Sequence, residues 1–361
     1  MDRPDAAADR AAQTFAPRSQ CVRAVSEGDG EAVTTLWNLV FAHDGSTRRR
    51  TVADWEWLYA RNPWGRQAYL CEHDDGRVVA HYAGIPLRFQ CFGRRAIAAL
   101  VLDSMAHADG RTGLAVAGSF VRTARAWVEH YSPPAVNAFH YGFPNTRALA
   151  VGRRFLAYAP MFERVPTLFR SFYEEQDDGT LGGGTLRGGR PSSLVVEEVD
   201  RFGPWSSGLN ALWQRLAPLY PVAMVRDAAW LVWRFDQCPW PAYRRFLVRA
   251  ENGELRGWFV TRNEWQSQPI LAVADLLVAP DDADAVLAVL RGAVQAAREG
   301  PHVRVELWLP EQHPTFRHAL AAGFRTELSL STLVYVPRAA ELSMGRMRQH
   351  LYYTIADSDH W

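Results

Sequence analysis

The chain has 361 residues, enough for two domains of about 150 to 180 residues that each bury a core of their own. Its 40 lysines and arginines balance 39 aspartates and glutamates, so the composition creates no overall field that would attract nucleic acid or an anionic membrane. The four cysteines show no C-x-x-C spacing, which argues against a zinc site or a disulfide framework, and no apolar stretch approaches the roughly 18 residues of a membrane span. We therefore expect a cytoplasmic protein without a metal, and with neither nucleic acid nor membrane as a partner.

Residues 1–18 are rich in alanine and aspartate and lack an apolar core, which predicts a disordered lead rather than a signal peptide. Residues 19–173 then show the apolar periodicity and turn residues of a first domain that mixes strands and helices. Its expected elements are a strand at 21–25, helices through 36–41 and over 52–61, strands at 67–72, 77–92 and 95–105, a helix at 114–130, a strand at 135–141, a helix at 146–153 and closing strands.

Residues 174–193 contain clusters of glycine that offer nothing to a core, which predicts a linker. A second domain over 194–338 repeats the order of the first, and residues 339–361 form a tail. The expected elements of the second domain are a strand near 194, helices around 213 and 233, strands near 245, 255 and 271, a helix at 282–297, a strand at 303–309, a helix at 316–322 and closing strands. The expected fold class is α/β, with a mixed sheet of the α+β kind in each domain.

A tryptophan-rich pattern occurs twice, at an offset of 176 residues. The recurring groups are Leu36-Trp37 with Leu212-Trp213, Trp57 with Trp233, and Pro63-Trp64 with Pro239-Trp240. Because only 14 of the 361 residues are tryptophan, three such pairs at one offset argue against coincidence. The period is far longer than the roughly 20 to 50 residues of solenoid repeats, so we interpret it as two copies of one domain.

A glycine-containing turn, Gly110-Arg111-Thr112-Gly113, comes directly before the helix predicted from Leu114. The first backbone N–H groups of a helix have no partner within it and lie at the positive end of its dipole, which suits a phosphate or pyrophosphate. Arg111 adds a cation. The alternative is an ordinary structural start of a helix.

The order and flanking residues of these elements resemble the GNAT superfamily of acyl-CoA-dependent N-acyltransferases, in a tandem two-domain form. The segments that carry the resemblance are Trp55–Tyr59 with Asn62-Pro63, Asp75–Ala80, Asp103–His107 and Tyr141–Asn145. It covers about residues 20–165 well and about 194–335 more faintly. The resemblance implies two GNAT-like domains, each with a mixed sheet flanked by helices.

The resemblance further implies that the first copy binds acetyl-CoA or another acyl-CoA. Ser104 and Met105 would form the strand edge that pairs with the pantetheine arm, and Asn145 would contact it. The residues that would cradle the pyrophosphate are Gly110, Arg111, Thr112, Gly113, Leu114 and Ala115. This turn departs from the family pattern R/Q-x-x-G-x-G/A in either alignment of its glycines.

The second copy departs further from the family, because residues 279–284 read Ala-Pro-Asp-Asp-Ala-Asp at the corresponding place. Carboxylates at the start of a helix suit its dipole but repel a pyrophosphate. We therefore expect the second copy to be degenerate, serving as structure or shaping the acceptor pocket.

Acyl transfer requires a neutral amine and a proton for the departing thiolate. Asp103 lies where the family often places a carboxylate base, His107 is a second candidate base, and Tyr141 is the candidate proton donor. Each also has a structural reading, as a strand-end cap, a loop histidine and a core tyrosine respectively.

The tail is aromatic and then acidic from Tyr352 to Trp361, which favours docking against the body of the protein. Similar endings occur in tandem GNAT proteins found with polysaccharide biosynthesis. If the tail folds back over the first domain, Asp357 and Asp359 would hold a cationic amine or amino sugar. The alternative is a packed tail with solvated carboxylates.

The sequence thus predicts an N-acetyltransferase or related N-acyltransferase that moves an acyl group from acyl-CoA to a primary amine of a small molecule, for example an amino sugar, by direct attack. One alternative is a catalytically silent acyl-CoA-binding or scaffold protein with a GNAT-like fold. Another is an aminoacyl-tRNA-dependent transferase. The sequence does not indicate an oligomeric state.

Overall fold

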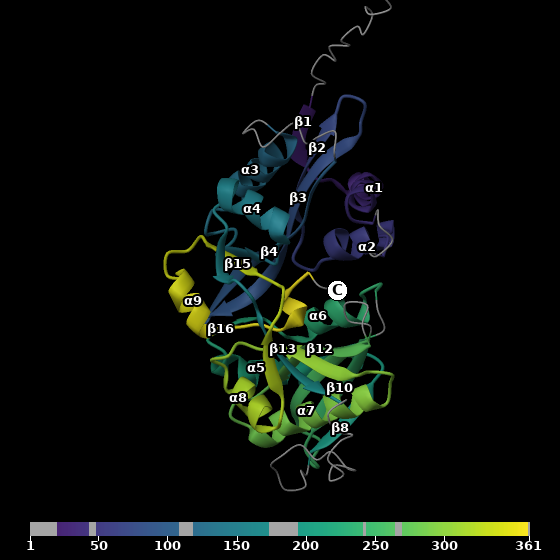
Figure 1. The fold of residues 1–361 in the computed structure, drawn as a ribbon, viewed down its shortest axis with the longest axis vertical. Helices are drawn as coiled ribbons and strands as arrows, with labels where there is room; N and C mark the ends of the chain where they lie inside the picture. Colours follow the sequence, from purple (N-terminus) through teal and green to yellow (C-terminus); the bar gives the residue numbers. More distant parts are fainter. Residues whose placement is uncertain are drawn as a thin grey trace, which may run out of the picture.

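The computed structural model of the protein describes residues 20–42, 48–107, 118–172, 194–240, 243–263 and 269–359. Two mixed β-sheets, each flanked by helices, make up most of these residues (Figure 1). One sheet lies mainly in the purple-to-teal half of the chain and the other mainly in the green-to-yellow half. The α/β fold class expected from the sequence is therefore confirmed.

The first sheet has nine strands, seven of which form one hydrogen-bonded path. In order across the sheet these seven are β1 (Gln20–Ala24), β2 (Gln67–His73), β3 (Val78–Cys91), β4 (Arg94–Ala106), β5 (Phe139–Gly142), β15 (Leu333–Pro337) and β6 (Ala159–Phe162). Two short strands extend the sheet from β3, namely β9 (Val222–Met224) and β16 (Leu351–Tyr352). Along the main path, β4 and β5 form the parallel pair.

The second sheet has seven strands. In order across it these are β14 (Arg325–Leu328), β7 (Pro166–Ser171), β13 (Arg304–Trp308), β12 (Ile270–Val278), β11 (Leu255–Arg262), β10 (Tyr243–Arg249) and β8 (Val195–Val199). Its parallel pair is β12 with β13, so both sheets place a parallel pair among antiparallel neighbours. Every residue of β12 is buried, as expected for a central strand covered on both faces.

Each half of the chain contributes to the sheet of the other half: the first half gives β7 to the second sheet, and the second half gives β9, β15 and β16 to the first. β7 precedes the linker but pairs with β13 and β14 of the second sheet. β15 comes from the second half and lies between β5 and β6 of the first sheet, where the yellow end of the chain returns to the upper half of Figure 1. The limits expected at 173 and 194 therefore do not separate one sheet from the other.

Helices cover the faces of both sheets (Figure 1). They are α1 (Gly30–Phe41), α2 (Val52–Trp55), α3 (Ser119–Tyr131), α4 (Thr146–Phe155), α5 (Ser206–Leu216), α6 (Ala228–Leu231), α7 (Ala283–Arg298), α8 (Pro314–Ala321) and α9 (Met344–His350). α2 and α6 both continue into a π-helical turn, Glu56–Ala60 and Val232–Asp236. Within the described part of the chain, no helix combines the length and apolar character needed to cross a membrane.

The strand expected at 135–141 begins only at Phe139. The backbone N–H groups of Val136 and Asn137 both donate to the carbonyl of Pro133, at 2.8 and 3.1 Å, which forms a turn where the strand was expected. The Pro133-Pro134 pair explains the turn, since proline fixes its own φ and has no N–H for a sheet. The helix expected from Leu114 is described from Ser119, and the preceding glycine turn lies outside the described residues.

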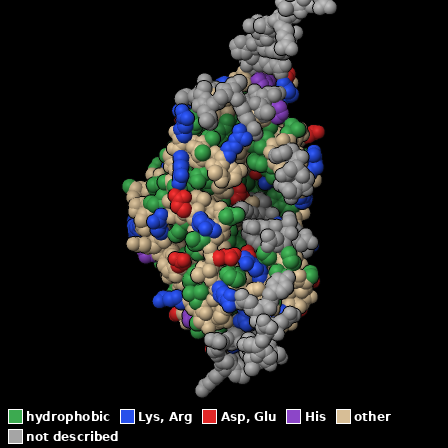
Figure 2. All heavy atoms as spheres, in the orientation of Figure 1, with side chains coloured by type: hydrophobic (Ala, Val, Ile, Leu, Met, Phe, Trp, Pro, Cys, Tyr) green, Lys and Arg blue, Asp and Glu red, His purple; other side chains and the backbone are tan. Residues whose placement is uncertain are grey.

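One apolar cluster runs through both halves and includes fully buried tryptophans from each. On the face drawn in Figure 2, basic and acidic side chains are interspersed over both halves, as the balanced composition predicts.

Candidate active site

A cavity of about 410 Å³ lies where β4 and β5 separate. The two strands pair from Ala98 with Phe139 to Val101 with Gly142, and neither pairs with the other beyond that point. Gly142 permits the last close approach, because a Cβ there would lie 2.8 Å from the Val101 carbonyl oxygen. The separation leaves strand edges free to pair with an extended ligand.

A β-bulge in β4 turns two predicted site residues toward this cavity. Leu102 pairs with Ala83 and Met105 pairs with His81, so Asp103 and Ser104 together lie opposite a single residue of β3. Asp103 has a φ of 49°, in the left-handed region that a side chain with a Cβ adopts only when its surroundings hold it there.

Three side chains hold the Asp103 carboxylate. Oδ1 accepts from Trp37 Nε1 at 3.1 Å, and Oδ2 accepts from Tyr59 OH at 2.7 Å and from Arg50 Nη1 at 2.5 Å. The guanidinium of Arg50 also lies over the Trp37 ring, 4.3 Å from its centroid. The Asp103 backbone carbonyl accepts from Nδ1 of buried His81 at 2.9 Å.

This environment fixes Asp103 as an anion. Burial acts to raise the pKa of the carboxyl group, but the charge and hydrogen bond of Arg50 outweigh burial and hold the pKa below its ordinary value. A carboxylate with a lowered pKa is a weak proton acceptor. The arrangement therefore suits a fixed negative charge better than a general base.

Of the other predicted residues, Ser104, Asn145 and Asp359 also line the cavity. Asn145 caps the start of α4, because its Oδ1 accepts from Ala148 N at 2.9 Å, and its amide nitrogen is the remaining polar group of the side chain. Asp359 belongs to the docked tail, so the tail does reach the first copy's cavity.

Met105, His107 and Tyr141 do not line the cavity. Met105 is buried. His107 follows the end of β4, where its backbone N–H donates to the Val79 carbonyl at 2.9 Å. Neither residue is part of the described lining of the cavity, so the roles of His107 as a base and of Met105 in the pantetheine edge stay predictions.

The Tyr141 side chain is buried and does not line the cavity. Its hydroxyl has no hydrogen-bond partner among the described residues, and burial together with the nearby Asp357 carboxylate raises its pKa well above the ordinary value.

Two other tyrosines line the cavity. The hydroxyls of Tyr82 and Tyr158 hydrogen bond to each other at 2.7 Å, and burial raises the pKa of Tyr158 to about 12.

Asp357 has a structural environment instead of the expected substrate-facing one. It is buried and forms an ion pair with Arg226, and its Oδ2 accepts from the backbone N–H of Thr354 at 2.8 Å. Arg226 is fully buried and also donates from Nε to Asp275 at 2.9 Å. Asp357 therefore holds the tail in place through these contacts.

The second copy has the tail where the first copy has its cavity. Arg226 follows Arg50 by 176 residues, and its partner Asp275 lies beside a register shift in β12 as Asp103 lies in the bulge of β4. Thr354 Oγ1 of the tail donates to Asp275 at 2.9 Å, which fills this position from within the chain. At the start of α7, Asp282 accepts from Ala285 N at 3.0 Å, so a carboxylate of the chain already occupies the helix start.

Sequence reasoning missed the cavity residues Trp37, Arg50, Tyr82 and Tyr158. One signal for Arg50 was present, since it shares the 176-residue offset with Arg226. The predicted cradle from Gly110 to Ala115 lies outside the described residues. Among the described residues, no group of three or more His, Cys, Asp or Glu side chains is placed to hold a metal ion.

No protein-family model matches the sequence, and no curated protein sequence matches it either. Solved structures do. A probable N-acyltransferase from Enterococcus faecalis matches with a TM-score of 0.62 at 11% identity, over 89% of this chain and 73% of that chain. A GCN5-related N-acetyltransferase from Kribbella flavida matches with a TM-score of 0.60 at 13% identity, over 90% and 72%. The chain has the GNAT fold.

The GNAT fold extends over both sheets, because each of these matches covers about nine-tenths of the chain. An N-myristoyltransferase from Saccharomyces cerevisiae, solved with bound myristoyl-CoA, matches with a TM-score of 0.56 at 9% identity, over 88% of this chain and 78% of that chain. The GNAT resemblance identified in the sequence is confirmed at the level of fold.

Proposed function

We propose that the protein is an N-acyltransferase whose first copy transfers an acyl group, in the simplest case acetyl, from acyl-CoA to a primary amine of a small molecule. The observation that carries this proposal is the cavity between the separated ends of β4 and β5, where Ser104, Asn145 and Asp359 meet. Support comes from the fold neighbours, which include a GCN5-related N-acetyltransferase and an N-myristoyltransferase with bound myristoyl-CoA.

The pantetheine arm of the acyl-CoA would lie between the two strands. At Ser104 the backbone of β4 no longer pairs with β5. Asn145 lines the same cavity, and its amide nitrogen is not used by the cap of α4. The pyrophosphate would rest on the turn from Gly110 to Ala115, as the resemblance implies. We propose no role for the second copy in acyl-CoA binding, because the tail fills the corresponding position.

In the proposed reaction the amine nitrogen attacks the thioester carbonyl carbon, the carbon–sulfur bond breaks, and CoA leaves as a thiolate. The acceptor nitrogen, cationic when it binds, loses one proton to become a nucleophile and a second as the amide forms; the thiolate gains one, so the net reaction releases one proton to solvent. Asp359 is the tail carboxylate that lines the cavity, so it would orient the cationic acceptor and take its proton. The ionised Asp103 adds fixed negative charge, and Tyr158 would protonate the thiolate while its hydroxyl stays bonded to Tyr82.

The acceptor we propose is a small cationic amine, for example an amino sugar. Two carboxylates and one arginine line the cavity, which favours a cation, and its volume of about 410 Å³ favours a small molecule. The compartment we propose is the cytoplasm. All four cysteines are free thiols, two of them buried, which supports a reducing compartment.

The test is release of free CoA thiol when the protein is mixed with acetyl-CoA and a panel of primary amines, amino sugars included. An amine-dependent release supports the proposal. Asp359→Asn should raise the KM for the amine and leave the KM for acetyl-CoA unchanged, whereas Asp281→Asn, an exposed carboxylate of the second copy, should change neither. Thiol release that no amine accelerates would contradict the proposed reaction.

A second candidate function is binding of acyl-CoA without turnover. The observation that favours it is the Asp103 carboxylate, whose three hydrogen bonds and lowered pKa leave it a poor base. Micromolar binding of acetyl-CoA with no transfer to any amine would select this function.

A further inference from the structure

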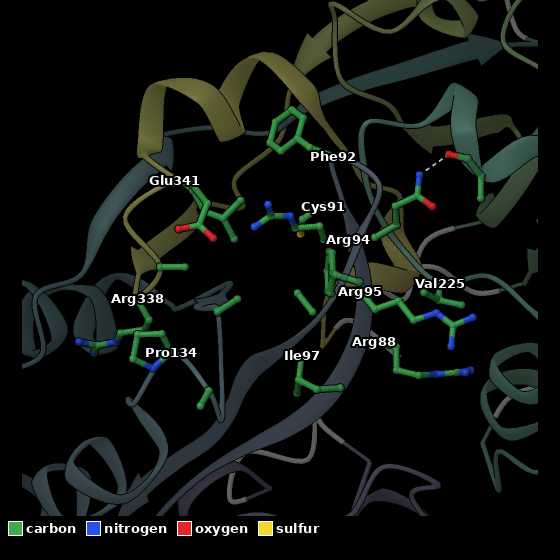
Figure 3. A pocket seen from close by; sticks show the side chains of 18 of the residues that line it. Arg88, Cys91, Phe92, Arg94, Arg95, Ile97, Pro134, Val225, Arg338 and Glu341 are labelled. Carbon is green, nitrogen blue, oxygen red and sulfur yellow. Dashed lines mark hydrogen bonds between the residues drawn. The ribbon is translucent and has the colours of Figure 1, made fainter.

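A larger cavity lies between the two halves of the molecule (Figure 3). Its volume is about 1370 Å³, against about 410 Å³ for the candidate active site. Its walls come from the adjoining ends of β3 and β4, from the turn before β5, from α5, and from the segment that follows β15. Along β4, Ile97 lines this cavity and Val101 is the first residue to line the active site, so at about 3.3 Å per residue the two linings are about 13 Å apart.

Arginines outnumber carboxylates in this interdomain cavity. Five arginines line it, Arg88, Arg94, Arg95, Arg338 and Arg346, against two acidic residues, Asp227 and Glu341. Asp227 is already used, because its two carboxylate oxygens accept from Arg88 Nη2 at 2.7 and 2.8 Å. Four arginines and one glutamate remain, which leaves an excess of three positive charges in a protein whose total charge is +1.

Three of the remaining arginines, Arg94, Arg95 and Arg338, have few hydrogen-bond or acidic partners within the chain to balance their charge. Arg94 and Arg95 are exposed at the start of β4, and neither side chain has a hydrogen-bond or ion-pair partner among the described residues. Nε of Arg338 is buried without a hydrogen-bond partner, and burial lowers the pKa of that side chain. In Figure 3, Arg338 and Glu341 lie on one side of the open space and Arg88 on the other.

Apolar side chains separate these charges. Phe92, Ile97, Pro134 and Val136 line the cavity, and the guanidinium of Arg346 lies over the Phe92 ring, 3.6 Å from its centroid. The walls therefore offer contact area to a ring or hydrocarbon portion in addition to cations. Trp213 also lines this cavity, and it is the residue that corresponds in the repeat to Trp37 of the active site.

We propose that the interdomain cavity binds a small molecule that carries two or more phosphate or carboxylate groups on a ring or hydrocarbon body. Guanidinium groups bind both anions through paired N–H donors, and an anion placed between unpaired arginines relieves their mutual repulsion. The site is separate from the proposed acyl-CoA site and does not depend on acyl transfer.

Calorimetric titration of the full chain with inorganic pyrophosphate, and separately with citrate, tests this site. We expect Arg94→Ala/Arg95→Ala to weaken the binding about tenfold or more, the effect of losing one or two charge-assisted hydrogen bonds. The matched control is Arg201→Ala/Arg317→Ala, which removes the same charge at two exposed arginines outside the cavity and should leave the affinity unchanged. Stronger binding of pyrophosphate identifies a phosphate ligand, and stronger binding of citrate a carboxylate ligand.

The Arg111→Glu variant separates this site from the predicted pyrophosphate turn of the active site, and it should bind either probe as the wild type does. If Arg111→Glu abolished binding while Arg94→Ala/Arg95→Ala did not, the anion would lie in the active site and the proposal would be wrong. Absence of binding of both probes to the wild type, or equal weakening by the control pair, would also overturn it.

Discussion

The indole nitrogen of Trp57 donates to the backbone carbonyl of Trp233 at 2.8 Å, and the indole nitrogen of Trp233 donates to the carbonyl of Trp57 at 3.1 Å. Their rings stack with centroids 5.0 Å apart and planes inclined by 17°. Each residue lies in a π-helical turn, and the two are 176 positions apart, the offset of the repeat. Reciprocal contacts of this kind arise when two equivalent surfaces meet about a local two-fold axis.

Trp57→Phe and Trp233→Phe should destabilise the protein by similar amounts. Each removes one N–H donor and with it one buried hydrogen bond, at a cost of about 1 to 3 kcal/mol. The double variant should cost less than the sum of the two, because the residues contact each other. Urea unfolding measures all three, with the half-buried Trp205→Phe as a control expected to cost less than about 0.5 kcal/mol. Strict additivity would show that the two indoles do not act as a pair.

Tyr158→Phe should lower kcat for the proposed acyl transfer about 10²-fold or more, because a positioned proton donor contributes roughly that much. The affinity for acetyl-CoA should stay the same. Tyr141→Phe removes the same atom from a buried tyrosine outside the cavity and should leave kcat unchanged. Release of CoA thiol under saturating amine measures both variants. The reverse order of effects would return the donor role to Tyr141, as expected from the sequence.

Arg226→Met should destabilise the protein by about 3 to 5 kcal/mol, because it leaves Asp275 and Asp357 buried without their cation. Hydrogen exchange should then increase in residues 354–358, which the ion pair holds against β12 of the second sheet. Arg201→Met, at an exposed position, should change stability by less than about 0.5 kcal/mol. Unchanged exchange in the tail of Arg226→Met would show that this network does not anchor it.

Stability should fall as the pH drops below about 6.5, the ordinary pKa of histidine in an unfolded chain. Burial lowers the pKa of both His140 and His313 to about 3, so between these values the unfolded chain binds protons that the folded protein does not. The stabilising contribution is complete above pH 6.5 and is reduced at pH 5 by about 2 kcal/mol for each histidine.

Urea unfolding at pH 7.5 and pH 5 measures this loss. His140→Asn/His313→Asn should reduce the difference between the two pH values by about 4 kcal/mol. His350→Asn replaces an exposed histidine and should leave the difference as in the wild type. An equal difference in the wild type and the double variant would rule out these two histidines as its source.

Local patterns in the sequence predicted most strands and helices, because apolar periodicity and turn residues act over short distances. They did not predict that β7 joins the second sheet or that β15 joins the first. The periodicity of a strand indicates that it pairs, but it does not indicate with which partner, and β15 pairs with residues of β5 nearly 200 positions earlier.

The candidate site was predicted in part for the same reason. Ser104 and Asn145 lie in segments that carry the GNAT resemblance, and both line the cavity. Arg50 and Tyr158 come from segments without such a motif. Arg50 reaches the cavity through its contacts with Trp37 of α1 and Asp103 of β4, and Tyr158 through the turn after α4, where its N–H donates to the Gly152 carbonyl at 3.2 Å. Asp357 and Asp359 are two residues apart in the tail, but only the fold shows that one pairs with Arg226 and the other faces the cavity.

Binding of acyl-CoA between β4 and β5 is tested most directly by titration calorimetry with acetyl-CoA on the wild type, Ala148→Trp and Ala150→Trp. Ala148 lines the cavity from α4, whereas Ala150 is exposed on the same helix outside it, so the same substitution fills the cavity in one variant only. We expect binding by the wild type and Ala150→Trp, and at least a hundredfold weaker binding by Ala148→Trp, about 2.7 kcal/mol. Equal affinity in all three proteins, or no binding by the wild type, would contradict an acyl-CoA site in this cavity.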